Sequence, residues 1–178
     1  LENAITPIQQ YSYTSGKNSS DSALIIDAMD ILYSGKVDGF CIVSSDSDFT
    51  RLALRLREAG MKVFGIGQKK TPNPFIVACD KFIYMEIIPI IEDESTAAAK
   101  TKRTKPSQKA SFDKVNRETL KLIAHTVYDL GDENGWAFLG DVGNLILKKQ
   151  PNFDPRNYGF QKLTPFFKSL PQFEIDKR

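Results

Sequence analysis

The sequence has few of the residues that build disulfide frameworks or zinc sites. It contains two cysteines, Cys41 and Cys79, and a single histidine, His125, in 178 residues. The two cysteines have no CxxC spacing, and one histidine does not complete an ordinary zinc site with them. Because Cys41 lies in an apolar run, we expect it in a core, and we expect a reducing compartment for the protein.

Long hydrophobic runs and a strong excess of one charge are also missing. No stretch approaches the roughly 18 apolar residues of a membrane span, and the first residues carry no signal-peptide pattern, so we expect a cytoplasmic protein. The formal net charge is only +2. Residues 1–91 hold 9 Lys and Arg against 10 Asp and Glu, and residues 112–178 hold 10 against 9. Any nucleic-acid binding must therefore depend on local patches.

Up to residue 91, the chain contains an alternation of strand and helix patterns. The predicted elements are an extended run at 8–13, a helix at 22–33, a strand at 40–44, a helix at 49–59, a strand at 61–67, a short helix at 75–79 and a strand at 81–84. Strands separated by helices predict parallel β-α-β units, and therefore a doubly wound α/β sheet.

Two further segments follow this first domain. Residues 92–111 combine alanines, basic residues and Pro106 without an apolar period, which predicts a solvated linker. Residues 112–178 form the second domain. Helical patterns at 115–130, 138–149 and 158–170 precede a short strand pattern at 172–175. Three helices with a terminal strand predict a small winged-helix-like α+β module.

Acidic residues gather where the predicted strand 40–44 ends and a helix begins. Asp46 and Asp48 follow this strand directly, and Asp21 opens the preceding helix. Ligands of parallel sheets bind at the carboxyl ends of the strands, and clustered carboxylates favour Mg²⁺ or Mn²⁺. Such an ion can activate water for attack on a phosphodiester. Asp is also a preferred N-cap residue, so position alone leaves capping and metal binding both open.

Four stretches of the first domain form a combined pattern: TSGKNSSDSALIIDAMD at 14–30, GFCIVSSDSDF at 39–49, GIGQKKTP at 65–72 and ACDKF at 78–82. With this pattern, the first domain resembles the NYN domain, the LabA-like branch of the PIN-like ribonuclease superfamily. The resemblance implies a PIN-like sheet and metal-dependent RNA cleavage. It also implies that Asp21, Asp46 and Asp48 are the catalytic, metal-binding residues. Asp27 is a fourth acidic residue that would support them without binding the metal itself.

One element of the family pattern has no match. The family's domain normally starts with a strand that ends in an aspartate, often in an Ile-Asp-x-x-Asn context, and LENAI at 1–5 does not fit it. We therefore expect that the N-terminal strand is missing, so that the chain is either a fragment or lacks one site carboxylate. In both cases, metal binding should be weaker and the neighbouring strand should lose its partner. Robust Mg²⁺-dependent cleavage by this chain would contradict that expectation.

The second domain has its own set of motifs: Leu120–Asp129, GWAFLGDVG at 135–143, NYGF at 157–160 and Lys162-Leu163. With these motifs, it resembles an OST-HTH/LOTUS domain, a winged-helix module thought to bind RNA. The available aromatic and basic groups for stacking and phosphate contact are Trp136, Tyr158, Lys148, Lys149 and Arg156. Trp136 also fits the role of a core anchor.

Four basic residues of the first domain are candidates for holding RNA phosphates. Lys17, Lys69 and Lys70 lie in loops predicted at the acidic edge, and Arg51 lies on the following helix. The sequence therefore predicts a metal-dependent ribonuclease with a C-terminal RNA-binding module. The alternatives are a non-catalytic RNA-binding or regulatory protein, and an adaptor whose C-terminal module docks a protein partner or a second copy.

Overall fold

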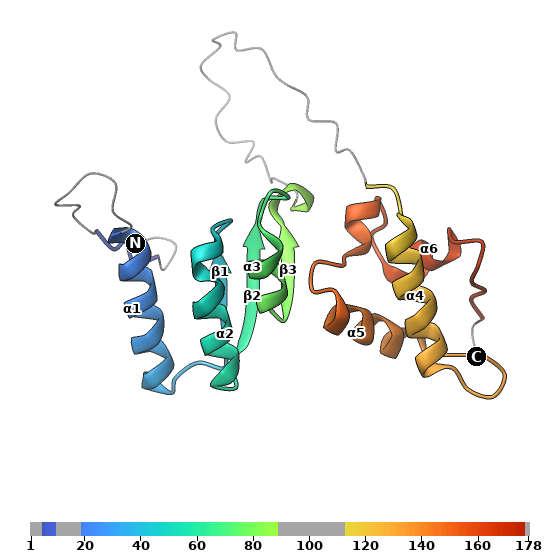
Figure 1. Cartoon of the computed structure of the whole chain (residues 1–178), viewed down its shortest axis with the longest axis horizontal. Coiled ribbons are helices and arrows are strands. Elements are labelled where there is room, and N and C mark those ends of the chain that lie inside the picture. The colour runs from blue at the N-terminus through green and yellow to red at the C-terminus, as the bar shows by residue number, and fades with distance from the viewer. Residues whose placement is uncertain (1–4, 10–18, 89–112, 177–178) are drawn as a thin grey trace, which may run out of the picture.

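The computed structural model describes residues 5–9, 19–88 and 113–176 (Figure 1). The first domain contains a three-stranded parallel sheet in the order β1-β2-β3. Its elements are helix α1 (Ser19–Ser34), strand β1 (Gly39–Val43), the 3-10 helix η1 (Ser47–Phe49), α2 (Thr50–Glu58), β2 (Lys62–Gly67), α3 (Asn73–Ala78), β3 (Lys81–Tyr84) and the 3-10 helix η2 (Met85–Ile87). The predicted parallel α/β class is confirmed.

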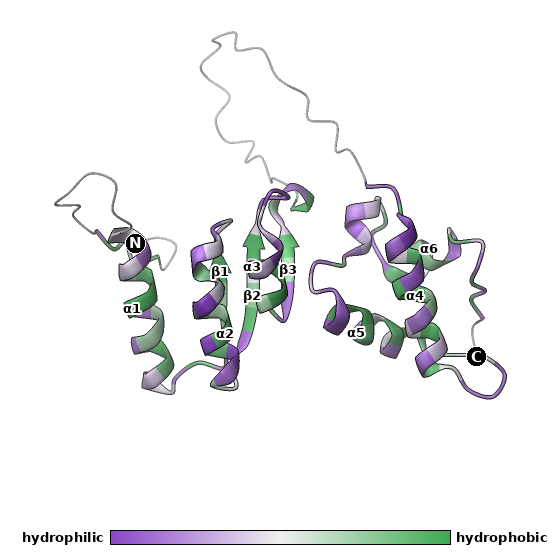
Figure 2. Ribbon diagram, viewed as in Figure 1, coloured by the Kyte–Doolittle hydropathy of each residue, from purple (hydrophilic) through white to green (hydrophobic). Residues whose placement is uncertain are grey.

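The core of this domain lies between the sheet and the helices α2 and α3. Ile42 of β1, Val63 of β2 and Phe82 of β3 are buried there together with Leu56 and Phe75. Figure 2 shows mainly apolar residues along β2 and β3 and polar residues on α2. Alternation along the strands places these side chains on one face. All three helices contact the same core, because Met29 and Leu32 of α1 also pack against it.

The other face and one edge of the sheet remain uncovered in the described part of the chain. Val43 and Phe64 are 63% and 42% exposed, so helices cover only one face of this sheet, and the doubly wound arrangement is not seen. An apolar groove of about 630 Å³ lies between α1 and β1, and Ile8 also lines it. Along this groove Leu24 and Ile31 of α1 are exposed. The expectation of a missing N-terminal strand stays a prediction.

The two cysteines have opposite environments, and the expectation of a buried Cys41 is wrong. Cys41 is exposed, because it shares the uncovered face with Val43, whereas Ile42 between them points into the core. Cys79 is buried, and its thiol donates to the carbonyl oxygen of Phe75 at 3.4 Å.

Burial raises the pKa of the Cys79 thiol to about 12. Since the thiolate is the reactive form, iodoacetamide at about pH 8 is expected to alkylate Cys41 alone in the folded protein. Intact-mass spectrometry should show one added group, and Cys41→Ser should show none. A modified Cys79 in the folded Cys41→Ser variant would contradict the assignment.

The second domain is built from helices. They are α4 (Arg117–Leu130), α5 (Leu139–Lys149), the 3-10 helix η3 (Pro155–Tyr158) and α6 (Leu163–Lys168). Ile123 of α4, Val142 and Ile146 of α5, and Phe166 and Phe167 of α6 form its core. Asn116 caps α4 by accepting a hydrogen bond from the backbone N–H of Thr119 at 2.7 Å.

Two predicted elements of this domain are wrong. The helix expected at 158–170 is divided, because Gly159 has φ +86°, a left-handed conformation that ends η3, and α6 begins only at Leu163. The strand expected at 172–175 does not form, and no strand occurs within 113–176. Phe173 and Ile175 still pack against the core, so their alternation reflects packing without a strand partner. Within 113–176 the helices α4 and α5 agree with the prediction, and the winged-helix-like module is not confirmed.

The second domain docks on the outer edge of β3. The backbone N–H of Phe82 donates to the carbonyl oxygen of Pro151 at 2.9 Å, and the Asn152 amide donates to the Tyr84 hydroxyl at 2.8 Å. Lys69 Nζ contacts Asp113 Oδ1 at 2.9 Å. An edge strand would otherwise present an unpaired N–H at Phe82, and the docked segment satisfies it.

Some predictions fall outside the described residues. These are the linker at 92–111 and most of the extended run at 8–13; residues 8 and 9 belong to no strand. Among the helices of the described ranges, none has the length and apolar character needed to cross a membrane.

Candidate metal centre

The turn that follows β1 is fixed by short-range hydrogen bonds. The Asp46 backbone N–H donates to Ser44 Oγ at 3.1 Å, and the Asp48 backbone N–H donates to Asp46 Oδ1 at 2.9 Å. Asp46 is therefore the N-cap of η1. Only one of its carboxylate oxygens has this role, so capping leaves the other oxygen available to a further ligand.

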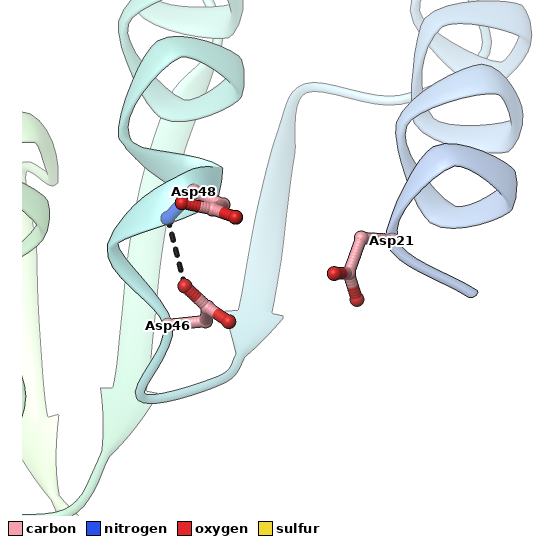
Figure 3. A group of neighbouring side chains, drawn as sticks. All are labelled: Asp21, Asp46 and Asp48. Atoms are coloured by element: carbon pink, nitrogen blue, oxygen red, sulfur yellow. Dashed lines mark hydrogen bonds between the residues drawn. The ribbon is translucent and has the colours of Figure 1, made fainter. Parts of the chain in front are cut away.

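Asp21 joins Asp46 and Asp48 from a different element. It lies in the first turn of α1, and Figure 3 shows its carboxylate directed toward the turn after β1. One carboxylate oxygen from each residue lies within 4.8 Å of the other two. Asp46 and Asp48 are exposed and Asp21 is half-buried. These three residues therefore converge at the carboxyl end of the sheet, as the sequence predicted.

The donor set of this cluster suits a hard divalent cation. Mg²⁺ holds oxygen ligands at 2.0–2.1 Å, so two ligand oxygens on opposite sides of one ion are about 4.2 Å apart. The oxygens of the cluster all lie within 4.8 Å of one another, which is close to this separation. Three carboxylates also repel one another, and a bound cation removes that repulsion.

A close approach between β1 and β2 holds this turn in place. A Cβ atom on Gly67 would lie 2.5 Å from the Ser44 carbonyl oxygen and 2.8 Å from Thr71 Oγ1, so only glycine fits there. Ser45 Oγ accepts a hydrogen bond from the Gln68 backbone N–H at 2.9 Å. The sequence-based prediction missed these positioning residues; their only local signal was a glycine at the end of a predicted strand.

Comparison with protein families assigns both halves of the chain. Residues 1–87 match the NYN domain, and residues 110–178 match the OST-HTH/LOTUS domain. The chain is an NYN domain followed by an OST-HTH/LOTUS domain. The family resemblances predicted from the motifs are thereby confirmed. Neither the curated proteins nor the solved structures give a match.

These two domains indicate the general function of the chain. The NYN domain indicates a ribonuclease-like function, and domains of this PIN-like type generally depend on a divalent metal. The OST-HTH/LOTUS domain is an RNA-binding module. The acidic cluster therefore lies in a domain of a type that generally depends on a divalent metal.

The other predicted residues of the NYN domain are distributed around the cluster. Asp27 lines the groove between α1 and β1 and is not one of the three clustered carboxylates. Lys69 already has partners within the protein: its backbone N–H donates to Glu86 Oε1 at 3.0 Å, and its ammonium group contacts Asp113. Lys70 is exposed on the same loop. Arg51 Nη1 lies 3.4 Å from Glu58 Oε1 on the surface of α2, and Lys17 lies outside the described residues.

The aromatic candidates of the OST-HTH/LOTUS domain have different degrees of burial. Tyr158 packs against Phe153 and Phe166, and burial raises the pKa of its hydroxyl. Its ring is therefore a core element rather than a stacking platform. Trp136 is half-buried and lines a cavity of about 370 Å³, so it is not one of the buried core residues. Lys149 is paired with Asp129 at 2.8 Å.

Proposed function

We propose that this protein is a divalent-metal-dependent ribonuclease whose OST-HTH/LOTUS domain holds the RNA. The observation that carries the proposal is the cluster of Asp21, Asp46 and Asp48 at the carboxyl end of the NYN sheet, with oxygens within 4.8 Å. Mg²⁺ or Mn²⁺ held by these carboxylates would supply an activated water and neutralise charge on a scissile phosphate.

The residues around the cluster supply its geometry and its access to RNA. Ser44 and Gly67 fix the turn that carries Asp46 and Asp48, and α1 presents Asp21. The cluster is exposed, so a flexible single strand can reach it without a conformational change. Lys70, on the loop after β2, lies at the same end of the sheet and is our candidate for phosphate positioning.

The test compares two aspartates of the same helix. Asp21→Asn is expected to abolish Mn²⁺-dependent cleavage of single-stranded RNA, whereas Asp30→Asn, an exposed position outside the cluster, should leave it unchanged. Cleavage is measured in a single turnover, with protein in excess over RNA.

EDTA should stop the reaction of the unmodified chain. Mn²⁺ binding, measured by titration calorimetry, should be lost together with cleavage in Asp21→Asn. If the unmodified chain binds RNA but does not cleave it with Mn²⁺, the protein is the non-catalytic RNA-binding or regulatory alternative. If Asp21→Asn cleaves RNA as fast as the unmodified chain, the acidic cluster is not the catalytic site.

A further inference from the structure

A further cavity lies where the two domains meet. It has a volume of about 420 Å³, and its walls come from β3 of the NYN domain and from α5 and the segment 153–163 of the OST-HTH/LOTUS domain. The docking contacts of Phe82 with Pro151 and of Tyr84 with Asn152 lie on the same strand, beside it. Lys81 is the one lining residue from the NYN domain, so docking is what brings its charge to a cavity otherwise lined by the OST-HTH/LOTUS domain.

The charged residues of this junction cavity are mostly basic. Lys81 comes from β3, and Arg156 and Lys162 come from the second domain. Asp154 is the one carboxylate in the lining, and the amides of Asn144 and Gln161 add neutral hydrogen-bonding groups. Three cations against one anion leave a net positive lining, although the whole chain is close to neutral.

The single carboxylate of the cavity, Asp154, interacts with the basic residues next to it. Asp154 is buried, and it accepts hydrogen bonds from Arg156 Nε at 3.0 Å and Arg156 Nη2 at 2.7 Å. Burial opposes ionisation of Asp154, but the hydrogen bonds and charge of Arg156 and the charge of Lys81 lower its pKa overall. Asp154 thus stays ionised and fixes Arg156, whose charge it balances. The excess positive charge belongs to Lys81 and Lys162.

We propose that the junction cavity binds a backbone phosphate of single-stranded RNA between Lys81 and Lys162, so that both domains hold one strand. Cationic side chains beside amide donors are the usual partners of phosphate oxygens. The proposal rests on RNA being the ligand in the proposed function, but it does not require cleavage.

The position of the cavity separates it from the acidic cluster. Lys81 begins β3, whereas Asp46 and Asp48 follow the end of β1, two strands away in a parallel sheet. Strand length and spacing put these two places on the order of 20 Å apart. The cavity therefore anchors the RNA several nucleotides from the candidate metal centre.

The experiment measures RNA binding by the full chain in EDTA, with a fluorescein-labelled oligouridine as the probe and no cleavage. Lys81→Gln/Lys162→Gln is compared with Lys121→Gln/Lys168→Gln, which removes the same charge from exposed positions outside the cavity. The slope of log K against log salt should fall by about 0.7 for each lost phosphate contact in the first variant. At about 0.1 M KCl this corresponds to roughly 5-fold weaker binding. The control should keep both the slope and the affinity.

Lys162→Gln alone tests whether a loss of docking explains the result, because Lys162 is exposed and takes no part in the docking contacts of Phe82, Tyr84 and Lys69 described above. It should show part of the slope change with an unaltered melting temperature. Equal losses in the cavity and control variants, or no loss in either, would overturn the proposal. A second experiment adds AMP and measures how far it protects Lys81 and Lys162 from chemical acetylation. If AMP protects these lysines but leaves the RNA affinity unchanged, the proposal is also overturned. Loss of cleavage in Asp21→Asn has no bearing on this result.

Discussion

Asp46→Asn is expected to remove metal-dependent cleavage while leaving the stability of the NYN domain nearly unchanged. The Asn side chain keeps the Oδ1 acceptor that caps η1 through the Asp48 N–H, but it loses the negative charge that a cation requires. A metal ion supplies several kcal/mol of transition-state stabilisation, so we expect the cleavage rate to fall by about 100-fold or more. The free energy of unfolding, measured with urea, should change by less than about 0.5 kcal/mol.

Asp46→Ala separates the two roles of this residue. It loses both the cap and the charge, so it should abolish cleavage and also lower the free energy of unfolding by about 1 kcal/mol. Mn²⁺ titration and urea unfolding of the Asn and Ala variants measure the two effects side by side. If Asp46→Asn retains Mn²⁺ affinity and cleavage, then Asp46 is only a helix cap.

Phe166→Ala is expected to unfold the OST-HTH/LOTUS domain. Phe166 is fully buried and lies in ring contact with Phe153, Tyr158, Phe160 and Phe167. Removing a buried phenylalanine ring costs about 3–5 kcal/mol. A domain of this size is stabilised by only about 3–10 kcal/mol, so much of it should be lost. Circular dichroism during urea unfolding measures the change, and RNA affinity should fall with it.

Phe138→Ala is the matched control for this core substitution. Phe138 precedes α5 and is 76% exposed, so its truncation should change the free energy of unfolding by less than about 0.5 kcal/mol. A similar loss of stability in both variants would contradict the placement of the core. So would a loss of less than about 1 kcal/mol for Phe166→Ala.

The predictable part of the fold consists of elements with local signals. Apolar runs and their alternation located β1, β2 and β3 within a residue or two, and periodic apolar positions located α4 and α5. The divided helix near Gly159 and the absent strand after Leu170 were missed for different reasons. Gly159 has a left-handed conformation, and nothing in the local sequence predicted it. Phe173 and Ile175 alternate like strand residues, but no other strand of the described domain is there to pair with them.

By itself, the sequence determined the acidic turn at Asp46 and Asp48 and the two domain families, because contiguous motifs specify both. Position alone left capping and metal binding both open for Asp21, Asp46 and Asp48, and the expectation of a buried Cys41 was wrong. Only the tertiary structure brought Asp21 to the turn and put Lys81 beside Arg156 and Lys162. These groups are far apart along the chain. Their distances depend on how whole helices and domains pack, which no local pattern encodes.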